Sequence, residues 1–129
     1  MSYYFAKTLS NVSFEEALQR VTEALQAEGF GILTEIDVQA TLKKKLDVDF
    51  RKYRILGACN PPFAYQALQA EDKIGTMLPC NVVVQELSPG QVEVAAIDPV
   101  ASMMAVDNHR LSEVAELVRK KLQQVVKGL

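Results

Sequence analysis

The sequence contains no tryptophan, a single histidine and only two cysteines, and it has no long hydrophobic run. No apolar stretch approaches the roughly 18 residues of a membrane-spanning helix, so we expect no membrane association. Two cysteines are too few for the disulfide framework of a small secreted domain. The first residues also lack the basic region and cleavage site of a secretory signal. The sequence therefore predicts a cytoplasmic protein in which both cysteines are thiols.

The sequence also lacks an excess of charge of either sign, because 14 lysines and arginines stand against 16 aspartates and glutamates. Proteins that bind nucleic acid through their overall charge are strongly basic, so we expect no nucleic-acid partner. The 129 residues have a mass of 14.3 kDa, and 49% of them are hydrophobic. This length and composition predict one packed domain over residues 1–129.

Motifs of the common enzyme classes are missing as well. The sequence has no P-loop, no GxGxxG motif and no closely spaced cysteine pairs of the kind that bind zinc. The only histidine, His109, lies near the start of a predicted helix, where a surface position is typical. No Ser-His-Asp set is recognised. The sequence on its own assigns no catalytic residue.

Hydrophobic periodicity predicts two long amphipathic helices. Ser13 and Glu16 form a capping box at the start of the first, and Gly29 supplies a left-handed stop at its end. The expected long helices cover residues 14–28 and 108–127, and shorter helical segments are indicated at 39–46 and 61–70.

Alternation of apolar and polar residues predicts strands at 3–9, 31–38, 53–59, 80–87 and 91–97. In the second strand the alternation places Ile32 and Ile36 on one face, and Leu33, Glu35 and Asp37 on the other. Two long amphipathic helices each need a sheet face to cover. We therefore predict an α+β two-layer sandwich in β-α-β(4)-α order with short helical inserts. Its mainly antiparallel sheet carries both long helices on one face.

This architecture leaves the second face of the sheet without a cover. A chain of this length has no further helical layer, yet not all of its apolar strand residues fit on the helix side. Either a second subunit or a ligand is expected to cover the open face, and a symmetric homodimer is the commonest solution. The residues that raise this question are Tyr3, Phe5, Leu33, Leu56, Val83 and Leu87.

The two cysteines stand at strand ends. Cys59 ends the third predicted strand and Cys80 begins the fourth, so antiparallel pairing of these strands would bring the thiols together. Asn60 is expected to cap the helix that begins at Pro61. Three interpretations remain open: two small buried hydrophobic residues, ligands for a metal or cofactor, or a redox-active thiol pair.

Three carboxylates and two methionines complete the candidates. Glu35 and Asp37 share one face of a strand and Asp98 ends another, as acid–base or hydrolytic chemistry would require, although such residues usually cap loops or face water. Met103 and Met104 would suit a soft metal ion alongside thiolates, although core packing is the commoner role. The candidate ligand-binding residues are Cys59, Asn60, Cys80, Glu35, Asp37 and Asp98.

Four segments together resemble one protein family over essentially the whole chain. They read EIDVQATLKKKL, YRILGACNPPFAYQAL, IGTMLPCNVVV and AAIDP, and they resemble the domain-of-unknown-function family 302. The resemblance implies a compact α+β domain similar to one repeat of the TATA-box-binding-protein-like folds, and a dimer. It implies no activity. The family's recurrent elements correspond here to Glu35, Asp37, Lys44, Cys59, Asn60, Pro61, Leu78, Pro79, Cys80, Asp98 and Pro99.

The function that these observations favour is a non-enzymatic, dimeric module. It would bind a small ligand, a soft metal ion or a partner near Cys59 and Cys80. The alternative is a redox enzyme that cycles these two thiols, although the CxxC motif typical of such enzymes is missing. A carboxylate-based hydrolase has the least support.

Overall fold

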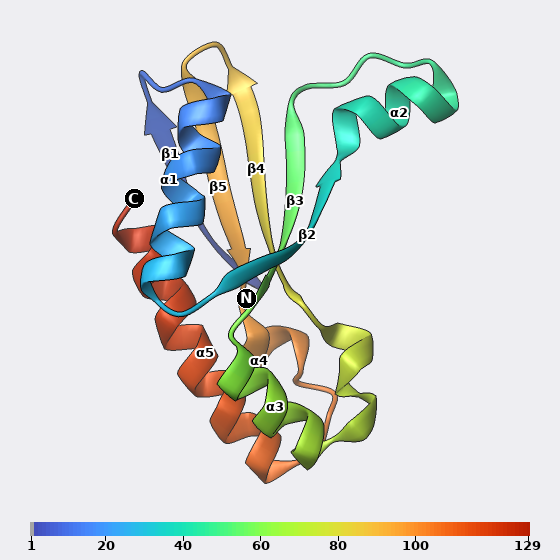
Figure 1. Ribbon diagram of the computed structural model, residues 1–129, viewed down its shortest axis with the longest axis vertical. Helices are drawn as coiled ribbons and strands as arrows, with labels where there is room; N and C mark the ends of the chain where they lie inside the picture. Colours follow the sequence, from blue (N-terminus) through green and yellow to red (C-terminus); the bar gives the residue numbers. More distant parts are fainter. Residues whose placement is uncertain (1) are drawn as a thin grey trace.

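The computed structural model describes residues 2–129 as one five-stranded sheet with helices packed on one face and around one end (Figure 1). This arrangement confirms the predicted α+β sandwich. In chain order the elements are β1 (Tyr4–Ser10), α1 (Phe14–Ala27), β2 (Gly31–Asp37), α2 (Val38–Leu46), β3 (Tyr53–Cys59), α3 (Pro61–Ala70), the 3₁₀ helix η1 (Asp72–Met77), β4 (Cys80–Ser88), β5 (Gln91–Ile97), α4 (Pro99–Ser102) and α5 (His109–Lys127).

The strands lie in the order β1-β5-β4-β3-β2, and every neighbouring pair is antiparallel. The hairpin β4–β5 and the strand β3 form the centre. The first strand of the chain closes one side against β5, and β2 closes the other against β3. A strand from the N-terminal part of the chain is therefore held at each edge of the sheet.

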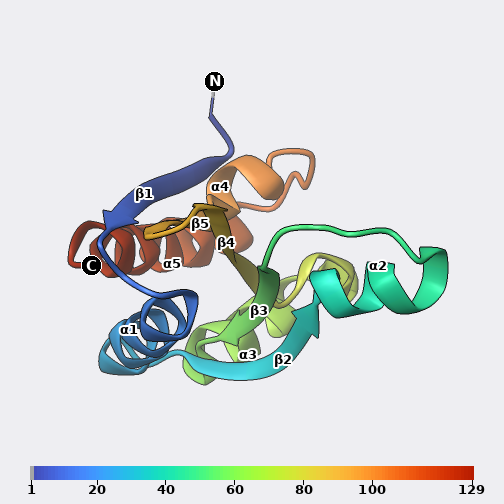
Figure 2. The same cartoon turned by 90° about the horizontal axis from the view of Figure 1, so that it is seen from above.

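The helices α1 and α5 cover the same face of this sheet (Figure 2). Ser13 accepts a hydrogen bond from the backbone N–H of Glu16 at 3.1 Å, and Gly29 has a positive φ of 88°. Both observations confirm the predicted ends of α1. Asn108 caps α5 in the same way through the N–H of Leu111 at 3.2 Å. Side-chain capping thus fixes where each long helix begins.

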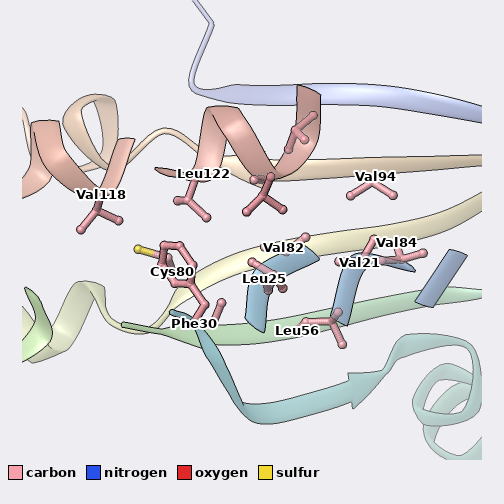
Figure 3. Close-up of a cluster of buried hydrophobic side chains, with 14 of the residues drawn as sticks. Val21, Leu25, Phe30, Leu56, Cys80, Val82, Val84, Val94, Val118 and Leu122 are labelled. Atoms are coloured by element: carbon pink, nitrogen blue, oxygen red, sulfur yellow. The ribbon is translucent and has the colours of Figure 1, made fainter. Parts of the chain in front are cut away.

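Between these helices and the sheet lies the hydrophobic core. Val82, Val84, Val92 and Val94 are fully buried on β4 and β5, and the apolar stripes of α1 and α5 pack onto them. Figure 3 shows part of this cluster, with Cys80, Phe30 and Val118 gathered at one end of it.

Two of the six residues that were not all expected to fit on the helix side do face it, and one prediction about a strand face was wrong. Phe5 packs against the core and Leu56 is 1% exposed, so both face the helices and not the open side. In β2 the register shifts between Ile32 and Thr34, so a bulge interrupts the alternation. Ile32 consequently faces the helices, whereas Ile36 pairs with Ile55 on the open face. The sequence pattern cannot reveal such a shift, because a bulge inserts one residue without changing composition.

The remaining helices lie at the two ends of the sheet. α3, η1 and α4 gather around the end at which β3 finishes and β4 begins, whereas α2 projects from the opposite end (Figure 1). Asp47 ends α2 in the left-handed conformation, and all nine residues of this helix are exposed or half-exposed. None of the helices between residues 2 and 129 is long and apolar enough to cross a bilayer.

Candidate functional site

Cys59 and Cys80 lie on adjacent strands at one end of the sheet. The register pairs Ala58 with Cys80, so Cys59 stands one residue beyond the partner of Cys80. Both strands are interior, so the thiols lie at an end of the sheet and not on an edge strand, as β2 separates β3 from solvent on that side. The antiparallel turn-back through α3 and η1 is what brings together two residues that are far apart in the sequence.

Both cysteines line an apolar cavity of about 310 Å³, which we call the end cavity. It lies between the end of the sheet, α3 and the first half of α5. Its wall consists of Phe30, Leu33, Ala58, Cys59, Asn60, Phe63, Ala64, Ala67, Leu68, Gly75, Leu78, Pro79, Cys80, Pro99, Met103, Leu111, Val114, Ala115 and Val118. Among the described residues, 2–129, none of those that form this wall carries a charge.

The mouth of the end cavity is marked by exposed leucines. Leu33, the bulge residue of β2, is 67% exposed, and Leu68 of α3 is 43% exposed. Both also line the cavity. The wall of the end cavity therefore includes two apolar side chains that are in contact with solvent.

Asn60 is the polar residue of the wall, and it is only 7% exposed. Its backbone carbonyl accepts from the N–H of Ala64 at 2.9 Å, so it occupies the N-cap position of α3. Its side chain does not cap that helix, contrary to expectation. The amide Nδ2 instead donates to the carbonyl of Glu28 at 3.1 Å. Pro61 and Pro62 leave few N–H groups to cap, so the amide ties the end of α1 to the start of α3.

Burial controls the chemistry of Cys80. Its side chain lies in the core and beside Cys59, and burial first, with the neighbouring thiol second, raises the pKa of Cys80 to about 11. Moving a charge from water into apolar surroundings costs free energy, so burial favours the neutral thiol. At neutral pH the end cavity therefore presents a thiol at this position and not a thiolate.

The structure does not bring Glu35 and Asp37 to the cysteines. Both face Arg54, whose guanidinium lies 2.6 Å from Glu35 and 3.4 Å from Asp37. Asp37 also accepts from the N–H of Ala40 at 2.9 Å and begins α2. These carboxylates balance a cation and cap a helix, which leaves neither free to act as an acid–base pair.

Asp98 likewise has a structural role. It is 8% exposed, accepts from the N–H groups of Val100 and Ala101 at 3.0 and 3.4 Å, and pairs with Arg119 at 3.2 Å. It thereby caps α4 and links it to α5. Asp98 does not itself line the end cavity, although the next residue, Pro99, does.

The soft-metal candidates separate in space. Met103 lines the end cavity with the two cysteines, whereas Met104 is 67% exposed and His109 pairs with Glu113 on the surface of α5 at 3.1 Å. Within residues 2–129, no three histidine, cysteine, aspartate or glutamate side chains lie close enough to hold a metal ion together. Two thiols and one thioether are therefore the sulfur donors in the wall of the end cavity.

Sequence reasoning missed most of the cavity wall. The sequence predicts Phe63, Ala67 and Val118 only as members of the apolar stripes of two helices. The structure shows that α3 packs on α5 beyond the end of the sheet, so these stripes enclose space. The sequence does contain a signal for this wall. The first five positions of α3 carry no charged or amide side chain, although a helix of ten residues needs no such broad apolar face to pack on a sheet.

The fold and the end cavity define a small α+β domain whose distinctive feature is an apolar pocket with two thiols in its wall. The chain belongs to the family described as Domain of unknown function DUF302, whose profile matches residues 5–129. Among solved structures, it is similar to an uncharacterized conserved DUF302 protein from Bacillus stearothermophilus. The TM-score is 0.89 at 26% identity, with 98% of each chain covered. None of the curated proteins compared with the chain matches it.

Proposed function

We propose that this protein is a non-enzymatic binding module that holds a small, uncharged, apolar ligand in the end cavity. The observation that carries the proposal is the cavity itself: about 310 Å³ of space lined by apolar side chains, with both cysteines in the wall. Ligand pockets typically begin at about 300 Å³, and an engineered cavity of about 150 Å³ already binds benzene. The ligand would therefore be larger than one aromatic ring.

The chemistry of the wall sets the class of ligand. A charged group in the end cavity would lose its hydration and gain no counter-charge, because none of the residues that line the cavity is charged. Asn60 and the thiols of Cys59 and Cys80 can form hydrogen bonds with one small polar group of the ligand, no more than a few atoms in size. A fused-ring compound or a medium-length acyl chain with one neutral polar end fits this description.

Thiol redox chemistry, the alternative, has less support. A thiol with a pKa near 11 is ionised to only about one part in ten thousand at pH 7, and the thiolate is the reactive form. Cys80 would therefore react slowly as a nucleophile in a cycle between dithiol and disulfide. Both cysteines are free thiols in this fold, which also supports a reducing, cytoplasmic location.

Binding of the uncharged dye N-phenyl-1-naphthylamine, followed by its fluorescence, tests the proposal. Ala64 lines the end cavity and is half-buried, so Ala64→Phe would place a ring inside it. We expect the affinity for the dye to fall about 10-fold or more, equivalent to roughly 1.4 kcal/mol. The matched control is Gln69→Phe, which adds the same ring to an exposed position of the same helix and should leave binding unchanged.

Two results would overturn the proposal. One is equal binding of the dye by Ala64→Phe and the unsubstituted protein, provided that both have the same circular dichroism. The other is an intact mass two hydrogens lower before reduction than after it. That result would show a Cys59–Cys80 disulfide and favour the redox alternative.

A further inference from the structure

The open face of the sheet, opposite α1 and α5, carries a continuous row of apolar side chains. The strand registers align one residue from each of the five strands: Ala6, Ala95, Val83, Ile55 and Ile36. We call these five residues the apolar row. Their side chains range from half-buried to exposed, and that of Ile36 is 48% exposed. Soluble monomers seldom expose a continuous apolar surface of this kind.

The positions beside the apolar row carry little charge. Tyr4 and Ile97 pair on one side of it, and Tyr4 is 44% exposed. On the other side, Glu93 accepts from Gln85 at 2.9 Å, and Gln85 accepts from Arg51 at 2.8 Å. The centres of protein–protein interfaces are likewise rich in aromatic residues and poor in charge.

The chain exposes more surface than the average folded monomer of its mass. A folded monomer of this mass has an accessible surface of about 6,800 Å² on average. This chain exposes 7621 Å², about 800 Å² more. A standard interface buries about 800 Å² of each partner, an area of the same order as this excess. Part of the excess comes from α2, which stands apart from α1 and α5 (Figure 2).

The apolar row is complementary to a copy of itself. It is small at the β1 end, with Ala6 and Ala95, and large at the β2 end, with Ile55 and Ile36. A two-fold axis through Val83, in the plane of the interface and parallel to β4, sets the large half of one row on the small half of the other.

The flanking residues fit the same axis. In the row beside it, Ile97 of one copy would face Gly57 of the second, where no side chain stands. On the other side, Glu93 would face Tyr53 of the second copy, over whose ring Arg51 lies at 5.6 Å. An acidic group would then meet a basic one at two symmetric places, which favours this pairing over a shifted one.

We propose that two copies of this chain associate face to face through the apolar row, with Val83 of each copy at the two-fold axis. The proposal goes beyond ligand binding, because the open face and the end cavity lie in different parts of the fold. A nucleic acid fits this face less well, since the strand positions on it carry the acidic Glu93 and phosphates require basic groups.

Sedimentation velocity of the full chain at tens of micromolar tests the pairing. The unsubstituted protein should sediment at twice its 14.3 kDa. Val83→Glu and Val83→Lys each place like charges against each other at the axis, so each should weaken association about 100-fold or more. A one-to-one mixture of the two variants should restore the dimer, because opposite charges then meet. That restoration would also show that neither variant had lost its fold.

Leu117→Glu is the matched control, since Leu117 is 46% exposed on α5 and lies away from the open face. It should leave the dimer intact. A 14.3 kDa species for the unsubstituted protein would overturn the proposal, as would full dimerisation of folded Val83→Glu. A monomer that binds duplex DNA, with binding lost in Val83→Glu, would assign the face to a nucleic acid instead.

Discussion

At the scale of single residues, Cys80 shows how burial sets chemistry. The thiol is 8% exposed and lies against Phe30 and Val118 at one end of the core (Figure 3). Burial and the neighbouring Cys59 together raise the pKa of Cys80 to about 11, from 9.0 for a free thiol. The folded protein therefore holds this proton more tightly than the unfolded chain does.

This difference predicts a pH dependence of stability. Below pH 9 both states keep the proton, so the free energy of unfolding is unaffected. Between pH 9 and about 11 only the unfolded chain loses it, and unfolding becomes easier by about 2–3 kcal/mol. In urea unfolding across this range, the free energy of unfolding should fall more steeply with pH for the protein than for Cys80→Ala. Ultraviolet absorbance of a Cys80 thiolate at pH 8 would contradict the prediction.

The candidate residues show what a sequence can and cannot tell at this scale. Neighbouring strand ends brought Cys59 and Cys80 together, as their positions suggested. The ionic partner of the carboxylates could not be predicted in this way, because it is distant from them in the chain. Arg54 lies between Glu35 and Asp37 only once β2 and β3 have paired. Pattern reasoning identifies a charged side chain but not the opposite charge that neutralises it.

Among the elements, α2 is the one that contributes least to the core. All its residues are exposed or half-exposed, and it stands apart from the other helices (Figure 1). The register pairs Asp37 with Arg54, so β2 and β3 would meet as a hairpin without α2. Helices as short as nine residues are marginal in water and need a tertiary partner. Helix α2 is therefore an addition to the fold and does not support it.

Replacement of residues 39–52 by Asn-Gly tests this conclusion. The turn would join Val38 to Tyr53 and continue the hairpin by one pair. We expect the variant to fold, with an unfolding free energy within about 2 kcal/mol of the original, because a shorter loop offsets the few contacts that are lost. Chemical denaturation gives this value. An unfolded variant would show instead that α2 is required for the sheet.

The predictability of the elements follows from how local their signals are. Capping residues and apolar stripes identified α1 and α5 to within about a residue, and the apolar alternation of β5 identified that strand. The bulge in β2 and the place of β1 beside β5 were not predicted. Register and strand order depend on which segments meet in space, and a single sequence carries little of that information.

For the whole molecule, the strand order joins the two ends of the chain. Seven residues of β1 pair with β5, and Leu9 of β1 is buried in the core. Lys7 donates to the backbone carbonyls of Lys127 and Leu129 at the end of α5. The first and last elements are therefore in contact, and we expect residues 2–129 to unfold as one cooperative unit.

Removal of residues 1–10 should consequently unfold the entire protein. The deletion exposes the edge of β5 and removes Leu9 and Phe5 from the core, a loss comparable to the whole stability of about 5–15 kcal/mol of a small domain. Far-ultraviolet circular dichroism should show an unfolded chain, in contrast to the variant that lacks 39–52. In the complete protein, circular dichroism and tyrosine fluorescence should report one coincident urea transition, because Tyr4, Tyr53 and Tyr65 lie on β1, β3 and α3, elements that are far apart in the sequence. Two separate transitions, or a folded deletion variant, would show that the end of the chain carrying α3 and α5 is stable without β1.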